Sequence, residues 1–156
     1  MEEELTSVIT PMIFAGPPRQ VWNLLIFYEQ IDEPPPLDLR LLLPVPKGTQ
    51  GRKSEVGDEA KCLYQGGHLV KRVTHIEPGR HYGFEVVEQD LQVGGGIRLA
   101  GGAYTLREIP GGTEVTLATR YASPRRPRWL WRRIEAAVCH RLHRHILGAM
   151  RRNGTR

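Results

Sequence analysis

The sequence lacks several features that would assign a protein quickly to a class. It contains only two cysteines, Cys62 and Cys139, which form no CxxC pair, and no apolar run approaches the roughly 18 residues of a membrane-spanning helix. The acidic residues Glu2–Glu4 are the opposite of the basic start of a signal peptide. We therefore expect a cytoplasmic protein with two buried thiols and no disulfide framework.

Established catalytic motifs are also absent from the sequence. It contains no P-loop, no GxSxG, no HExxH and no Rossmann fingerprint. The glycine cluster at residues 94–96 precedes no helical pattern, so we interpret it as a turn. We expect no cofactor.

A histidine pair near the C-terminus raises the question of a metal site. His140 and His143 stand at i and i+3, a spacing at which two histidines can share a metal ion, and Cys139 precedes them. A helical wheel places both histidines among arginines on the outer face, where the positive charges would repel a metal ion. We therefore expect no metal site.

The composition is that of one globular domain, with 40% hydrophobic and 25% charged residues. Its charge is uneven, because residues 124–156 hold ten Arg and one Glu, a net charge of +9, whereas the whole chain carries +5 and residues 1–123 therefore carry −4. This basic segment suits an anionic membrane surface or an acidic partner, through Arg132, Arg133 and Arg144. The simpler alternative is a solvated face that aids solubility. We expect no nucleic-acid partner.

A long amphipathic helix is predicted over residues 126–152. Pro127 suits its entry, and Asn153 with Gly154 suits its exit. At about 100° per residue one stripe is apolar and contains Trp131 and Ala149 at its centre, with Leu130, Ile134, Val138, Leu142 and Ile146. Glu135, Arg141 and His145 interrupt the stripe or its edge. Such a helix needs an apolar surface to cover.

The rest of the chain predicts an antiparallel sheet preceded by two short helices. A strand is expected at 5–14, helices at 18–30 and 37–43, and a loop in the polar run at 47–57. The apolar helix at 37–43 is expected to pack over an opening in the core. Glycine-rich turns then separate strands at 58–65, 68–77, 81–90, 97–109 and 113–122, which is typical of a meander.

Strict alternation assigns an inner face to each strand. Arg98 shares this face with Tyr104 provided that Gly101-Gly102 is not a bulge, which would reset the phase. The residues expected to face inward are Ala60, Cys62, Tyr64, Val73, His75, Tyr82, Phe84, Val86, Tyr104, Leu106, Val115, Leu117, Thr119 and Tyr121.

The order of elements, together with the segment FAGPPRQVW, resembles the START-like or SRPBCC superfamily. Ala15, Pro17, Pro18, Val21 and Trp22 carry the match to the entry of the first helix, and residues 112–115, Gly-Thr-Glu-Val, resemble the start of a late strand in these proteins. The resemblance covers nearly the whole chain and implies an α+β helix-grip fold. In that fold a curved sheet of six or seven strands wraps around the C-terminal helix and leaves a cavity. A seventh strand would lie in residues 44–57 or be absent.

The predicted cavity combines apolar and aromatic side chains with a few polar groups, as small-molecule sites usually do. Glu135 and His145 are about 15 Å apart along the helix, so each pairs with a sheet residue or binds the polar end of a ligand. The complete candidate lining is Met12, Phe14, His75, Tyr82, Phe84, Arg98, Tyr104, Tyr121, Trp131, Glu135, Leu142 and His145.

Three functions remain open at this point. The first is binding or transport of a small hydrophobic molecule, such as a lipid, an isoprenoid or an aromatic compound. The second, which the resemblance implies, is a polyketide cyclase, aromatase or dehydratase with Arg98, Tyr104 and His145 as candidate catalytic residues. The third is a peripheral membrane or partner-binding module that uses the arginine face. A cavity wholly filled by side chains would exclude the first two.

Overall fold

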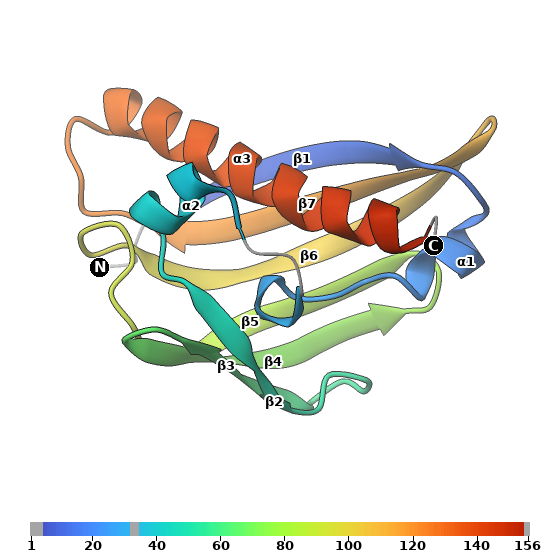
Figure 1. Ribbon diagram of the computed structural model, residues 1–156, viewed down its shortest axis with the longest axis horizontal. Coiled ribbons are helices and arrows are strands. Elements are labelled where there is room, and N and C mark those ends of the chain that lie inside the picture. The colour runs from blue at the N-terminus through green and yellow to red at the C-terminus, as the bar shows by residue number, and fades with distance from the viewer. Residues whose placement is uncertain (1–4, 32–34, 155–156) are drawn as a thin grey trace.

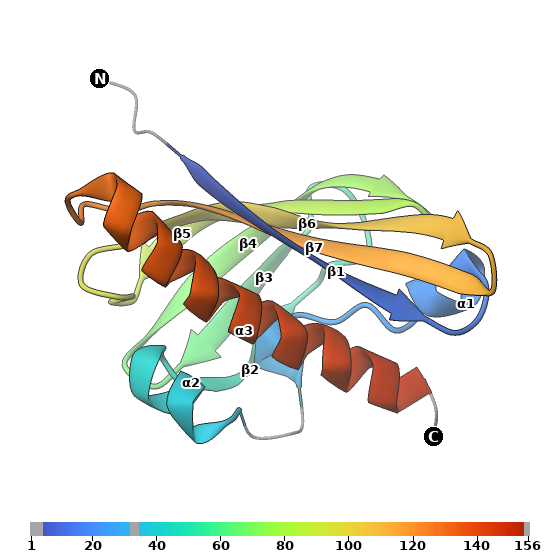
Figure 2. The same ribbon diagram turned by 90° about the horizontal axis from the view of Figure 1, so that it is seen from above.

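The computed structural model describes residues 5–31 and 35–154. Seven antiparallel strands form one sheet in the order β1-β7-β6-β5-β4-β3-β2, and the long helix α3 (Arg128–Gly154) lies across one face of it (Figures 1 and 2). The predicted α+β class and helix-grip architecture are therefore confirmed. The strands are β1 (Thr6–Phe14), β2 (Pro46–Gly51), β3 (Glu59–Tyr64), β4 (Gly67–Glu77), β5 (His81–Asp90), β6 (Arg98–Ile109) and β7 (Gly112–Ala122).

Glycines close the tight turns of the meander, as the sequence predicts. Gly66, Gly79 and Gly111 have φ values of 94°, 77° and 85°. These lie in the left-handed region, which side chains larger than glycine rarely adopt. Consecutive strands from β3 to β7 therefore pair with their neighbours.

The seventh strand lies within residues 44–57, where one of the two alternatives placed it. β2 pairs with β3, and Thr49 stands opposite Cys62. The expectation that the polar run at 47–57 is wholly a loop is wrong for Lys47–Gly51. An edge strand tolerates polar residues because one side of it faces solvent.

The first helix is much shorter than predicted. Instead of one helix over 18–30, the chain forms α1 (Pro18–Trp22) and a single 3₁₀ turn, η1 (Tyr28–Gln30). Phe27, Tyr28 and Glu29 are all buried. Consecutive residues of an α-helix point about 100° apart, so burying all three favours a path other than a continuous helix.

The second helix, α2 (Leu37–Leu42), matches its predicted position and lies beside α3 (Figures 1 and 2). Arg141 Nε of α3 is 3.0 Å from Asp38 Oδ2. Only Leu39 is fully buried, whereas Leu37, Leu41 and Leu42 are exposed. The expectation that this apolar segment packs over an opening in the core therefore holds in part, because Leu39 is buried and Leu42 and Leu43 line a pocket, whereas Leu37 and Leu41 face solvent.

The long helix α3 spans Arg128–Gly154. Its C-terminal turns bury Ile146, Leu147 and Met150 against the sheet, whereas Leu130 and Ile134 of the predicted stripe are 39% and 43% exposed. The wheel is also wrong for His143, which is fully buried. The wheel judges faces by hydrophobicity alone, but buried polar side chains are tolerated where they find hydrogen-bond partners. No helix among the described residues is both long and apolar enough to cross a membrane.

Two irregularities in the sheet change which side chains face inward. Register shifts occur between Val73 and His75 of β4 and between Leu99 and Gly101 of β6. Each bulge reverses the alternation beyond it. The inward placements of His75 and Arg98 are therefore wrong, and both side chains are exposed.

Candidate functional site

A pocket of about 230 Å³ lies between the N-terminal half of α3, the adjoining ends of β6 and β7, the loop at 91–97, and the residues at the end of α2. We call it the α3 pocket. Its walls are mainly apolar. The lining residues are Leu42, Leu43, Val93, Gly94, Ile97, Leu99, Thr119, Tyr121, Arg125, Trp131, Ile134, Glu135, Val138, Cys139 and Leu142.

The bulge in β6 forms part of this wall. Leu99 pairs with Tyr121 across the two strands, and directly opposite residues share one face of a sheet. Both side chains line the α3 pocket. An apolar leucine therefore occupies the place that strict alternation would give to Arg98.

The loop between β5 and β6 closes one end of the pocket. Gly95 and Gly96 have φ values of 78° and 113°. A Cβ on Gly95 would lie 2.9 Å from Arg125 Nη2, and one on Gly96 would lie 3.3 Å from Pro124 Cγ. Glycine therefore permits the loop to lie against the segment that enters α3.

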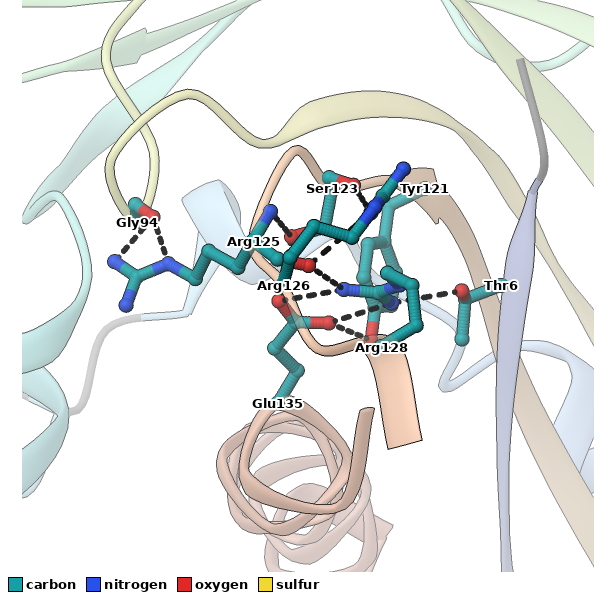
Figure 3. A network of polar contacts seen from close by, with 8 residues as sticks. All are labelled: Thr6, Gly94, Tyr121, Ser123, Arg125, Arg126, Arg128 and Glu135. Carbon is teal, nitrogen blue, oxygen red and sulfur yellow. Dashed lines mark hydrogen bonds and ion pairs between the residues drawn. The ribbon is translucent and has the colours of Figure 1, made fainter. Parts of the chain in front are cut away.

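Glu135 is the buried carboxylate of this region, and its partners surround it (Figure 3). Tyr121 Oη donates to Oε1 at 3.0 Å, and Ser123 Oγ donates to Oε2 at 2.6 Å. Arg128 Nη2 lies 3.0 Å from Oε1 and completes an ion pair. Burial raises the pKa of Glu135, but hydrogen bonds from Arg128, Ser123 and Tyr121 outweigh that effect and hold its pKa below the usual value. Glu135 is therefore ionised at neutral pH.

A second network of polar side chains includes Thr119 and Cys139, which line the α3 pocket. His143 Nε2 lies 2.7 Å from Thr119 Oγ1 and 3.4 Å from Cys139 Sγ. On its other side, Nδ1 lies 2.8 Å from Thr10 Oγ1, which is also 2.7 Å from His140 Nδ1. The two histidines thus share a threonine, and the described residues contain no cluster of three or more potential metal ligands.

The protonation states of His143 and Cys139 favour a structural role for this network over a nucleophilic one. Burial, followed by the nearby His140, lowers the pKa of His143 to about 4. Burial raises the pKa of the Cys139 thiol to about 11. At neutral pH the imidazole is uncharged and the thiol keeps its proton, so the pair is not the thiolate–imidazolium arrangement of a reactive cysteine.

Another buried ion pair fills the opposite part of the sheet's concave face. Glu29 receives hydrogen bonds from Lys71 at 2.9 and 3.1 Å and from Tyr64 Oη. Lys71 Nζ lies over the rings of Phe27 and Phe84, 4.6 and 5.1 Å from their centroids. Burial raises the pKa of Glu29, but Lys71 and Tyr64 outweigh it and lower the pKa. Sequence reasoning missed this pair, although strand alternation places Lys71 between Leu69 and Val73 on the inner face.

The twelve predicted lining residues separate into three groups. Tyr121, Trp131, Glu135 and Leu142 line the α3 pocket. His75 and Arg98 are exposed outside it. The other six, which are Met12, Phe14, Tyr82, Phe84, Tyr104 and His145, are buried or partly buried in the interior.

The interior residues are held by partners in the protein itself. Tyr104 Oη donates to the carbonyl of Ile26, and Tyr82 Oη donates to that of Lys53, each at 2.6 Å. The ring of His145 meets that of Tyr28 edge to face, with centroids 6.1 Å apart. The candidate catalytic residues Arg98, Tyr104 and His145 therefore do not converge on the α3 pocket.

The pocket also contains residues that sequence reasoning missed. Arg125 lies just before the predicted helix and Cys139 lies within it. Cys139 was considered only as a possible metal ligand, and nothing in the strand or helix pattern marks either residue as part of a pocket. Leu99 is missed because the bulge is invisible to alternation. Thr119 was assigned to the inner face of its strand but not to a site, although the pattern sufficed to include it.

No described protein family and no curated protein matches the sequence of this chain. Solved structures do match its fold. The Zhui aromatase/cyclase from Streptomyces sp. R1128 has a TM-score of 0.65 at 13% identity, over 98% of this chain and 95% of that one. Ara h 8.0201 has a TM-score of 0.60 at 10% identity, over 97% and 99%. The Aha1 dimer from Colwellia psychrerythraea has a TM-score of 0.57 at 12% identity, over 94% and 93%.

These similarities extend over almost the full length of each chain, although the identities are low. They agree with the observed order of strands and with the long terminal helix packed on one face of the sheet. The chain therefore has the helix-grip fold.

Proposed function

We propose that the protein binds a small hydrophobic molecule in the α3 pocket. The observation that carries this proposal is the open volume of about 230 Å³ with mainly apolar walls. Most of the concave face of the sheet is otherwise filled by the protein's own side chains, including Phe27 and Tyr28. An apolar hollow that the core leaves open is the usual form of a small-molecule site.

The size of the pocket narrows the class of ligand. Typical ligand pockets have about 300–1,000 Å³, so this one accepts a compact molecule or one end of a longer molecule. Among lipids, isoprenoids and aromatic compounds, the volume favours a short chain or a small ring system. Trp131 and Tyr121 supply aromatic surface, and Thr119 supplies a hydroxyl group at the wall.

Filling the pocket tests the proposal. In Val138→Phe a larger side chain occupies the hollow, whereas in Ala137→Phe the same ring is added at a neighbouring exposed position of α3. We expect the first variant to lose binding of apolar fluorescent probes and the second to keep it. Native mass spectrometry of the purified protein would identify any molecule that co-purifies. Equal probe binding by the two variants would contradict this site.

A polyketide cyclase, aromatase or dehydratase activity has less support from the arrangement of side chains. Arg98 is exposed, and Tyr104 is hydrogen-bonded within the core. Burial and the negative charge of Glu135 raise the pKa of Tyr121, which favours donation of a hydrogen bond over proton abstraction. We therefore propose ligand binding as the primary function.

A second candidate function is contact with an anionic membrane. Arg132, Arg133 and Arg144 are exposed on α3, and Trp129 is 65% exposed near its beginning. Large aromatic and apolar side chains beside arginines are typical of surfaces that enter the membrane interface. We expect salt-sensitive binding to vesicles containing phosphatidylserine. Replacing the three arginines by Gln should abolish that binding, and retained binding would contradict the proposal.

A further inference from the structure

Arg125 occupies a special position at the α3 pocket. It lies in the segment between β7 and α3 and forms part of the pocket's lining. Its Nε and Nη2 atoms donate to the carbonyl of Gly94 at 2.9 and 2.5 Å (Figure 3). Its guanidinium carbon lies 4.6 Å from the ring centroid of Trp131. These contacts fix a half-buried cation in one orientation.

The charges around the pocket are unequal. Glu135 is paired with Arg128 and receives hydrogen bonds from Tyr121 and Ser123. Within residues 5–31 and 35–154, by contrast, no carboxylate forms an ion pair with Arg125. The pocket lining therefore carries one balanced acid and one cation, Arg125, whose charge is offset by no acidic side chain in the part of the chain that the structure describes.

Arg125 retains the capacity to bind an anion. A guanidinium has more N–H donors than the contacts with Gly94 use. Arginine pairs well with carboxylate and phosphate groups because its planar fork offers parallel donors. The attraction is stronger beside apolar walls than in bulk water, since the local dielectric constant is lower.

We propose that Arg125 selects ligands that carry an anionic group at one end of an apolar body. This inference rests on the proposed function, because it assigns the class of ligand for the same pocket. The anionic group contacts Arg125, and the apolar body lies against Leu99, Val138 and Leu142. The ionised Glu135 disfavours the opposite orientation, since its negative charge would lie near that of the ligand.

A matched pair of probes separates charge recognition from apolar burial. Octanoate and octanol have similar chains, but only octanoate is charged at neutral pH. We expect the wild-type protein to bind octanoate about tenfold more tightly than octanol, the scale of a charge-assisted hydrogen bond in a partly exposed site. Isothermal titration calorimetry measures both affinities.

Three arginine variants provide the comparison. Arg125→Gln should remove the preference for octanoate and leave the affinity for octanol nearly unchanged. Arg126→Gln is the control, because Arg126 is exposed and donates to the backbone carbonyls of Ser123 and Arg125. It should keep the full preference. Arg125→Lys keeps the charge without the fork and should keep part of the preference, which provides a test if Arg125→Gln folds poorly.

The outcomes distinguish this inference from the proposal beneath it. If the wild-type protein binds both probes equally, selection by Arg125 is wrong, while hydrophobic binding stands. If neither probe binds, both proposals fail. If Arg125→Gln and Arg125→Lys lose both probes equally, and amide exchange of the loop at 91–97 accelerates, Arg125 only fastens that loop and the inference is overturned.

Discussion

Arg128 Nη2 lies 3.0 Å from Glu135 Oε1, and the side chains are 16% and 7% exposed. Seven positions separate the two residues, which is about two turns of α3. The salt bridge ties the beginning of the helix to the acid that Tyr121 and Ser123 also hold (Figure 3). It therefore fixes the helix entry that forms one wall of the α3 pocket.

Replacing Glu135 by Gln should destabilise the protein by about 2 kcal/mol, because a largely buried guanidinium loses its counter-charge. Urea unfolding measures this change. The matched control is Glu114→Gln, which removes an ion pair to the exposed Arg107. Since exposed pairs contribute about 0–1 kcal/mol, the control should change stability less. Equal losses would show that Glu135 is not held as described.

The free energy of unfolding should depend on pH because the pKa of His143 is lowered in the folded protein. Its pKa is lowered to about 4 in the folded protein from a usual value of 6.5, so the unfolded state binds a proton first as the pH falls. The contribution of His143 to the free energy of unfolding is then constant above pH 6.5 and decreases by about 3 kcal/mol as the pH approaches 4. As the pH falls below 4.5, the usual pKa of glutamate, stability decreases further, because the pKa values of Glu29 and Glu135 are lowered in the folded protein.

Urea unfolding at a series of pH values checks the assignment to this histidine. His143→Gln should lower stability at neutral pH and flatten the slope between pH 6.5 and 4, so the difference from wild type shrinks as the pH falls. The control variant His75→Gln changes an exposed histidine and should keep the wild-type slope. A slope that survives in His143→Gln would assign it to other groups.

Lys71→Met should be strongly destabilising. It leaves the fully buried carboxylate of Glu29 without its cation, a change that typically costs about 3–5 kcal/mol. Glu29→Gln combined with Lys71→Met removes both charges and should recover part of the loss. A double-mutant cycle by chemical denaturation measures the coupling. Additive losses would mean that the two side chains do not interact.

Gly95→Ala should affect both stability and ligand preference. Alanine at φ 78° is strained by about 1 kcal/mol, and its Cβ would lie 2.9 Å from Arg125 Nη2. Gly79→Ala is the control, since φ is 77° there but, among the described residues beyond its two chain neighbours, no atom lies within 4 Å of the new Cβ. Calorimetry with octanoate should show weaker binding only for Gly95→Ala. Unchanged octanoate binding by Gly95→Ala would show that this position of the loop does not affect ligand binding through Arg125.

Local patterns predicted the strands well but placed some side chains on the wrong face. Alternation correctly buries Tyr64, Val73 and Tyr104. It fails at His75 and Arg98, because the bulges arise from pairing with neighbouring strands and leave no clear mark in their own segments. The glycine pair Gly101-Gly102 indicated a possible bulge, and the register shift occurs immediately before that pair.

In the terminal helix, local sequence patterns likewise placed a polar residue on the wrong face. Hydrophobic periodicity predicted its length and located Leu142 and Ile146 on the inner side. It placed His143 outside because a wheel contains no information about partners. Thr10 and Thr119 are distant in sequence from His143, yet they hydrogen-bond both ring nitrogens and make its burial favourable.

The sequence by itself determined the order of strands, the long helix and the α+β class, because turns and periodicity depend on residues close together in the chain. Only the tertiary structure decided where open space remains. The segment at 22–31 fills much of the concave face, the bulge in β6 brings Leu99 to the pocket wall, and Arg128 balances Glu135. Each of these results depends on contacts between distant segments, since packing and ion pairing are settled in three dimensions.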